Sequence, residues 1–184
     1  MLDAATGLFL SEGFARTSLA GVATAAEVTR GAIYHHFEDK RALFEAVMER
    51  FERDAVAHIG QAAAAADSPW DAAMRSMEAF LDYTCDDAYG RIVWQQGPLA
   101  LGFERWRECG EEYGLGLTRH LFKQLLDNGD IAPAPLELLT RMVFANIAEC
   151  GLLLAETPAA EKQQVRDECS TILRRILEGL RGRG

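Results

Sequence analysis

The chain has 184 residues, of which 49% are hydrophobic, and its formal net charge is −9. The apolar fraction is ample for a packed core and argues against a disordered chain. The acidic balance excludes a protein that coats nucleic acid by charge alone. The sequence contains no run of about 18 uncharged apolar residues, and its start lacks the basic residues of a signal peptide. We therefore expect a cytoplasmic protein with no transmembrane helix.

Helical patterns dominate, and no segment shows the alternation typical of a β-strand. The sequence therefore predicts an all-α fold of about nine helices, with caps and breakers setting their limits. In chain order we predict a helix over residues 2–12, a short helix capped by Thr17 or Ser18, another from its cap Thr29 to about residue 37, a long helix capped by Asp39, and helices over residues 70–86, 89–96, 103–127, 135–156 and about 158–180.

The chain divides into a small N-terminal head and a larger body in this prediction. An alanine run over residues 62–66 ends at Asp67-Ser68-Pro69, which suits the start of a new helix. Gly97-Pro98 is predicted to stop the sixth helix, and residues 128–130 form a turn. We assign residues 1–55 to the head and residues 56–184 to the body.

The head has the pattern of a helix-turn-helix, which is two short helices joined by a tight turn at residues 27–28. On a helical wheel, Val28, Ile33 and Phe37 face inward along the third helix. Small and polar residues occupy its outward face: Gly31, Ala32, Tyr34 and His35, with Arg30 at the rim. Small side chains on this face would let the helix approach a DNA groove closely.

The polar residues of this face suit DNA contacts. Arg30 can reach a guanine edge or a phosphate, and Tyr34 and His35 can donate hydrogen bonds to phosphate oxygens. Lys40 begins the fourth helix, where an ammonium and backbone N–H groups together would hold a phosphate. Residues 1–54 carry six Lys and Arg against nine Asp and Glu, so binding must rest on a small local patch.

The segment Gly-Ala-Ile-Tyr-His-His-Phe, followed by Asp-Lys-Arg-Ala-Leu-Phe, resembles the tetracycline-repressor (TetR) family. The resemblance is strong over residues 2–48, and beyond them only the number and order of the helices match. It implies a homodimeric regulator of double-stranded operator DNA, most often a repressor, that a small molecule releases. It also implies DNA-contact positions: Thr17 or Ser18, Arg30, Gly31, Ala32, Tyr34, His35 and Lys40.

The body shows no catalytic constellation, so we do not expect an enzyme or a cofactor other than the small-molecule effector. Asn146 and Glu149 lie three residues apart in an apolar helix, where they either bond to neighbouring side chains or line an effector pocket. Aromatic side chains could form the walls of such a pocket or belong to the core: Trp94, Phe103, Trp106 and Tyr113. A pocket of this kind would suit a hydrophobic or aromatic ligand.

The last two helices are the predicted dimer interface. The helix over residues 135–156 is apolar almost all round, which predicts burial on every side, and the last helix carries an apolar stripe. Two such pairs would form a four-helix bundle across a two-fold axis, although both helices could instead fill the core of one subunit. The residues assigned to the interface are Leu152, Val165, Cys169, Ile172 and Ile176.

Two further groups of residues have alternative interpretations. The four cysteines are far apart in the sequence and suit buried, reduced thiols, with a redox-sensing disulfide as the alternative. His35 and His36 point about 100° apart on a helix, so they cannot both bind one metal ion, and we expect no metal site. The rival functions are a helical small-molecule carrier and an interaction module that does not bind DNA.

Overall fold

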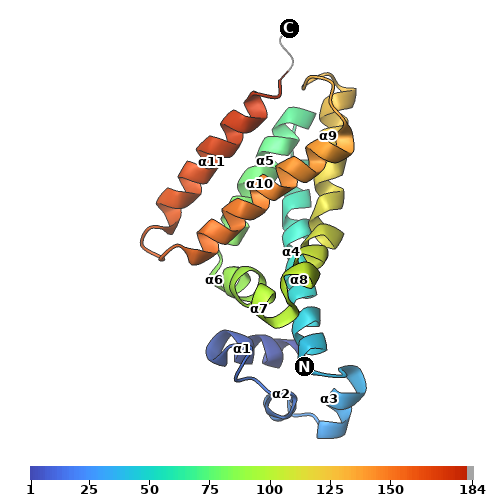
Figure 1. The fold of residues 1–184 in the computed structure, drawn as a ribbon, viewed down its shortest axis with the longest axis vertical. Helices are drawn as coiled ribbons and strands as arrows, with labels where there is room; N and C mark the ends of the chain where they lie inside the picture. Colours follow the sequence, from blue (N-terminus) through green and yellow to red (C-terminus); the bar gives the residue numbers. More distant parts are fainter. Residues whose placement is uncertain (182–184) are drawn as a thin grey trace.

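The computed structural model describes residues 1–181, which form an all-helical molecule with a small head at one end and a larger body at the other (Figure 1). Two π-helical stretches, η1 and η2, continue directly into their neighbours, so the described residues form nine continuous helical stretches, as predicted. The segments are α1 (Leu2–Glu12), α2 (Leu19–Ala25), α3 (Arg30–His36), α4 (Lys40–Ala64), α5 (Pro69–Thr84), α6 (Asp87–Tyr89), η1 (Gly90–Gln96), α7 (Gly97–Leu101), α8 (Phe103–Gly110), η2 (Glu111–Leu115), α9 (Gly116–Asp127), α10 (Leu136–Glu156) and α11 (Lys162–Glu178).

Side-chain caps begin the short helices of the head. Ser18, Thr29 and Asp39 each accept a hydrogen bond from a backbone N–H in the first turn of α2, α3 and α4, at 3.0, 3.1 and 2.8 Å. Of the two caps predicted for α2, the structure therefore selects Ser18. Thr17 is buried, and its hydroxyl donates to the Gly13 carbonyl oxygen at 3.0 Å. Such caps satisfy N–H groups that a helix leaves without partners.

The core of the head joins α1, α3 and the start of α4. Phe9, Ile33 and Phe44 are fully buried, and the Phe9 and Phe44 rings meet edge to face with centroids 5.0 Å apart. Phe14 packs on Phe44 in the same geometry at 5.3 Å. α4 continues from this core into the body, where it lies alongside α5 (Figure 1). One rigid helix therefore belongs to both parts of the molecule.

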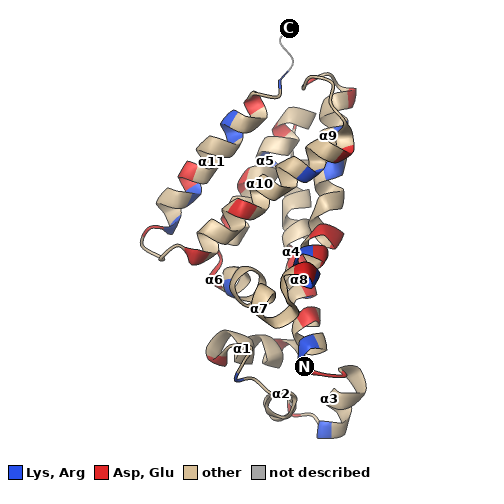
Figure 2. Ribbon diagram, in the orientation of Figure 1, with Lys and Arg blue, Asp and Glu red and all other residues tan. Residues whose placement is uncertain are grey.

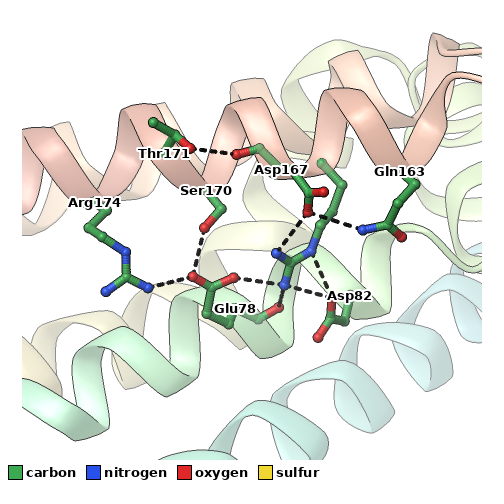
Figure 3. A network of polar contacts seen from close by, with 8 residues as sticks. Glu78, Asp82, Gln163, Asp167, Ser170, Thr171 and Arg174 are labelled. Carbon is green, nitrogen blue, oxygen red and sulfur yellow. Dashed lines mark hydrogen bonds and ion pairs between the residues drawn. The ribbon is translucent and has the colours of Figure 1, made fainter.

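A polar network holds the last helix, α11, against α5 (Figure 3). The guanidinium of Arg166 contacts the carboxylates of Glu78 and Asp82, each at 2.7 Å. Ser170 donates a hydrogen bond to Glu78 at 2.7 Å, and Arg174 forms an ion pair with the same carboxylate at 2.8 Å. Because the Arg166 side chain is only 13% exposed, its ion pairs are better shielded from solvent than ordinary surface pairs.

The sixth helical stretch is longer than predicted. Gly97-Pro98 was expected to end it, but the helix continues from α6 through η1 into α7 and ends at Leu101. Pro98 lies in the first turn of α7, where a proline needs no N–H, and the π-helical hydrogen bonds of η1 lead into it. Gly102, with a φ of +78°, ends the stretch instead.

α10 is less buried in one subunit than its composition suggests. Leu138, Met142 and Leu153 are 58%, 59% and 46% exposed, so the prediction that this helix is buried on every side is wrong for the single subunit. Asn146 and Glu149 are exposed as well. The length and hydropathy of α10 also suit a membrane span, a test that core helices of globular proteins meet too. The opposite face of α10 packs on η1, α9 and α11.

Candidate nucleic-acid interface and internal cavity

The outer face of α3 is open to solvent. Of its seven residues only Ile33 is buried, whereas Arg30, Gly31 and His35 are exposed and Tyr34 is 47% exposed. The Arg30 guanidinium lies over the Tyr34 ring at 5.7 Å from its centroid. Ala32 is half-buried. Of the three residues predicted to face inward, Ile33 is fully buried, and Val28 and Phe37 are half-buried against the same core. The small and polar side chains lie on the outward face, as the wheel predicts.

The turn between α2 and α3 fixes the direction of that face. Glu27 has a φ of +53°, which is left-handed backbone that is uncommon outside glycine. The next residue, Val28, donates its backbone N–H to the Ala23 carbonyl oxygen at 3.0 Å. This bond folds the turn tightly against α2, so α3 lies across α2 as a helix-turn-helix requires.

Two of the predicted contact residues have structural partners inside the head. The Lys40 ammonium donates to the Phe14 and Ala15 carbonyl oxygens at 2.6 and 3.1 Å and lies 4.4 Å from the Phe14 ring centroid. Lys40 thus ties the start of α4 to the chain that follows α1, instead of standing free to hold a phosphate. The burial of Thr17 excludes direct contact through its hydroxyl, while Ser18 is exposed.

Arg16 is an exposed cation that the sequence reasoning missed. It lies two residues before the cap Ser18, and its Nε donates to the Glu12 carbonyl oxygen at 2.8 Å. The sequence contains a signal for Arg16, since a cation close to the N-cap of a short helix of the head lies near the helix end that is expected to face DNA. Figure 2 shows how few basic residues the head displays. The candidate interface is therefore a small patch formed by α3 and the residues that precede α2.

The body contains an internal cavity of about 100 Å³ between α4, α5, η1 and α10. A second cavity of about 250 Å³ adjoins it, and the two share Glu52, Trp94 and Phe144 among their lining residues. Of the six predicted pocket residues, Trp94, Phe103, Trp106 and Glu149 line the second cavity. Tyr113 and Asn146 line neither cavity.

Three glycines make room for the aromatic walls of these cavities. A Cβ at Gly151 would overlap the Trp94 ring, and one at Gly97 would lie 2.6 Å from the Trp106 ring. A Cβ at Gly114 would lie 2.8 Å from the Phe144 ring. The absence of a side chain at these positions lets each ring lie directly on the neighbouring helix, which sets the shape of the cavities.

Glu52 is a functional candidate that the sequence reasoning missed. Its side chain is buried in α4, and its one hydrogen bond, from the Tyr89 hydroxyl, is long at 3.4 Å. Burial raises the pKa of Glu52 to about 7, against the opposing effect of the Tyr89 hydrogen bond. A signal was present, because Glu52 falls on the inner stripe of α4 with the apolar residues Met48, Ala55 and Ile59.

Polar contacts connect the wall of the second cavity to the head. Gln96 accepts the Phe14 N–H at 2.8 Å and donates to the Phe9 carbonyl oxygen at 2.9 Å, which caps the end of α1. Gln96 lies two residues after Trp94 in η1. Arg41 donates to the Leu101 carbonyl oxygen at 2.6 Å, joining α4 to the end of α7. These hydrogen bonds would therefore transmit a shift of η1 or α7 to the head.

An exposed apolar surface runs along α10 and α11. It consists of Leu138, Met142 and Leu153 on α10, with Ile172 and Ile176 on α11 at 57% and 41% exposure. We call these five residues the apolar stripe.

The structure places the five predicted interface residues differently from one another. Ile172 and Ile176 belong to the apolar stripe. Cys169 faces the core of its own subunit, and so does Leu152, which also lines the second cavity. Val165 is half-buried in the same core. None of the four cysteines forms a disulfide, and all but the half-buried Cys85 are buried.

Comparison with known proteins covers both parts of the chain. A family model described as "Bacterial regulatory proteins, tetR family" matches residues 1–47, and one described as "Tetracyclin repressor-like, C-terminal domain" matches residues 70–180. The HTH-type transcriptional regulator AcrR of Shigella flexneri is 52% identical over 52 residues, which is 28% of this chain and 24% of that protein. This chain thus matches about a quarter of the length of AcrR.

Two longer matches extend over most of the chain. The Transposon Tn10 TetC protein of Escherichia coli is 24% identical over 151 residues, 80% of this chain and 76% of that protein. Among solved structures, a TetR-family transcriptional regulator from Pectobacterium atrosepticum has a TM-score of 0.84 at 24% identity. It covers 98% of this chain, and the match covers 91% of that structure, so the two share the whole fold.

Proposed function

Because this chain belongs to the tetracycline-repressor (TetR) family, we propose that it is a DNA-binding transcriptional regulator, a repressor that a small molecule releases from its operator. The observation that carries the proposal is the outer face of α3, where six of seven residues are at least partly open to solvent and only Ile33 is buried. A helix built in this way can enter a major groove without disturbing the head's core.

The proposed DNA contacts divide by chemistry. Arg30 and Tyr34 are the base-reading or phosphate-binding candidates of α3, supported by His35, and Gly31 and Ala32 permit close approach. Ser18 and Arg16 contact the phosphate backbone at the start of α2. Lys40 acts through the head's structure, because its ammonium already binds two carbonyl oxygens.

The functional unit is a homodimer that pairs through α10 and α11. The apolar stripe supports this arrangement, since five large apolar side chains on two adjacent helices would otherwise face water. A second copy related by a two-fold axis would cover the stripe in a four-helix bundle. It would also supply the second recognition helix, so that two half-sites about 34 Å apart are read together.

The two cavities are the proposed effector site. An effector that displaces Trp94 would move η1 and, through Gln96, the end of α1. The heads would then stand at the wrong separation for successive major grooves. Such coupling requires that the effector bind the released state more tightly by only ~1–3 kcal/mol.

This function places the protein in the bacterial cytoplasm and makes it a regulator, not an enzyme. A helical ligand carrier would use the cavities alone, and an interaction module would use the α3 face for protein. Neither rival needs the α3 face to bind DNA. Binding to DNA therefore separates them from the proposed function.

The test is an electrophoretic mobility shift with the DNA upstream of the chain's own gene, followed by fragments of the whole genome at low salt. We expect a shifted complex. Arg30→Ala should weaken it by about fivefold or more, since a good base contact is worth ~1–3 kcal/mol. Arg75→Ala is the matched control, because it removes an exposed arginine of α5 in the body that lines neither cavity. The absence of a shift with any fragment would exclude the proposed function.

A further inference from the structure

Glu52 lies at the junction of the two cavities. Its carboxyl lines both the 100 Å³ cavity and the 250 Å³ cavity, as Trp94 does. The larger cavity extends to Phe103, which is 65% exposed, so this side of the site communicates with solvent. A molecule entering past Phe103 would reach Glu52 before it reached the inner cavity.

The polar atoms at this junction lack adequate partners. Glu52 receives only the long hydrogen bond from Tyr89, and no Lys, Arg or His of residues 1–181 forms an ion pair with it. The Ser76 hydroxyl is also buried and has no hydrogen-bond partner within the described part of the chain. The Trp94 indole N–H is buried too, and it has the Tyr89 hydroxyl nearby but no hydrogen bond of normal geometry. Buried polar groups of a folded protein nearly always have good partners, so a buried carboxylate with one long hydrogen bond beside two poorly paired donors indicates a ligand.

We propose that these cavities bind an apolar organic cation, a protonated amine on a ring-sized body, with its nitrogen at the Glu52 carboxylate. This inference rests on the proposed function, because it names the chemical class of the effector. The ligand's ring would fill the inner cavity. An acceptor atom on the ligand would satisfy the Trp94 N–H or the Ser76 hydroxyl.

The charge of the site favours a cation over the other ligand classes. An anion would be repelled by Glu52, and a neutral ligand would leave an ionised carboxylate buried without a counter-charge, which is costly. The walls add to the preference, since the faces of Phe80, Tyr89 and Trp94 attract a positive charge. Because the ligand supplies the missing positive charge, its binding removes the cost of burying Glu52.

The volume of the inner cavity indicates the smallest ligand that would fill it. An apolar cavity of ~150 Å³ holds benzene in another protein, so one ring with slight adjustment matches the inner cavity here. The adjoining 250 Å³ offers space for a longer substituent. A small aromatic amine is therefore the minimal probe.

Binding of such a cation should depend on pH, because Glu52 titrates near pH 7. The groups that face it are Tyr89 from α6 and, from α5, Tyr83 and the Ser76 hydroxyl. Burial raises the pKa of Tyr83 and that of Tyr89 above the usual value for a tyrosine, so neither side chain ionises near pH 7. On the side of the inner cavity, η2 and α10 contribute Gly114, Phe144 and Ala148, which carry no charge. The second cavity also has charged residues in its lining: Arg107, Glu111, Arg141 and Glu149. Both arginines form ion pairs with Glu111, and neither pairs with Glu52.

The experiment compares benzylamine with benzyl alcohol, which has the same shape but no charge, by isothermal titration calorimetry on the full chain. Benzylamine should bind more tightly, and its affinity should rise about tenfold from pH 6 to pH 8 as the carboxyl ionises. Glu52→Gln should reduce benzylamine binding at pH 8 at least tenfold and should not weaken the binding of benzyl alcohol. Asp54→Asn, an equal charge change at an exposed position of α4, should alter neither.

Three outcomes would overturn the inference: equal binding of the two probes, full benzylamine binding by Glu52→Gln, or no binding of benzylamine at millimolar concentration. Circular dichroism confirms that the variant is folded. The calorimetry uses no DNA, so its failure alongside an intact mobility shift would reject only the ligand class. Loss of the mobility shift with intact benzylamine binding would reject only the DNA-binding function.

Discussion

At the scale of single residues, Lys40 and Tyr34 illustrate two kinds of contribution to DNA binding. Lys40 holds the chain after α1 through two carbonyl oxygens, whereas Tyr34 is exposed on α3. Lys40→Ala should therefore lower the free energy of unfolding by roughly 1–2 kcal/mol, the worth of charge-assisted hydrogen bonds at a partly exposed site. Tyr34→Ala should change it by less than about 0.5 kcal/mol, as is usual at the surface.

Thermal unfolding and the mobility shift, measured on both variants, check this difference. Both variants should bind DNA more weakly. If Lys40→Ala melted like the wild type and yet lost DNA binding, Lys40 would be a direct phosphate contact, as the sequence alone suggested.

Glu52 makes the stability of the protein depend on pH. Its pKa is about 7 in the fold, against 4.5 for an unperturbed carboxyl, so the folded state retains a proton that the unfolded state releases between these values. The contribution of Glu52 to the free energy of unfolding is therefore fully present below pH 4.5. It decreases as the pH rises to about 7 and is lost above that pH.

Glu52→Gln removes this effect because an amide does not titrate. At pH 8 the variant should be more stable than the wild type by roughly 1–3 kcal/mol, and the difference should shrink towards pH 5. Urea denaturation at both pH values measures it, with Asp54→Asn as the control. A difference that is the same at pH 5 and pH 8 would contradict the assignment of the buried proton to Glu52.

At the scale of elements, the sequence predicted the head more accurately than the body. Ser18, Thr29 and Asp39 are local signals, and each begins its helix where the pattern places it. The predicted end of the sixth helix was wrong. Gly97-Pro98 would normally end an α-helix, but here it follows the π-helical stretch η1 and the helix continues through it.

The candidate site was only partly predictable for a similar reason. Trp94 and Trp106 stand out as aromatic residues, and both line a cavity. Glu52 lies on the inner stripe of α4 but in a charged segment, so the stripe hints at its burial, and the packing of α5 and η1 on α4 decides it. Tyr113 and Asn146 have suitable chemistry but line neither cavity.

The contact between α10 and η1 gives a test of the cavity wall. Gly151→Ala would place a Cβ within the Trp94 ring and should destabilise the fold by roughly 1–3 kcal/mol, as overpacking usually does. It should also reduce benzylamine binding, since the ring must move into the cavity. Gly60→Ala is the control: no atom lies within 4 Å of its new Cβ, so it should stabilise α4 by up to ~1 kcal/mol. Denaturation and calorimetry on both variants measure these effects. If Gly151→Ala kept the stability and the benzylamine affinity of the wild type, the Trp94 ring would be able to move aside without an energetic penalty.

At the scale of the whole molecule, the proposed dimer through the apolar stripe can be tested by mutation. The double variant Ile172→Glu, Ile176→Glu should be monomeric in sedimentation velocity, because four charges would face one another across the two-fold axis. It should keep its helical content and lose most of its DNA affinity, since one head reads only one half-site.

Leu99→Glu provides the control for this variant. Leu99 is 83% exposed on α7, away from α10 and α11, so the same chemical change there should leave the dimer intact. A dimeric double variant would show that the stripe is not the subunit interface, and the search would turn to another surface.

The isolation of Ile33 as the single buried residue of α3 has an evolutionary consequence. The other six positions of this helix can mutate at little cost in folding, so operator preference can diverge after gene duplication without compensating changes elsewhere. The cavities lie in the body and draw on a different set of residues. The two traits can therefore be inherited and selected almost independently, which allows one scaffold to acquire new pairs of operator and inducer by separate steps.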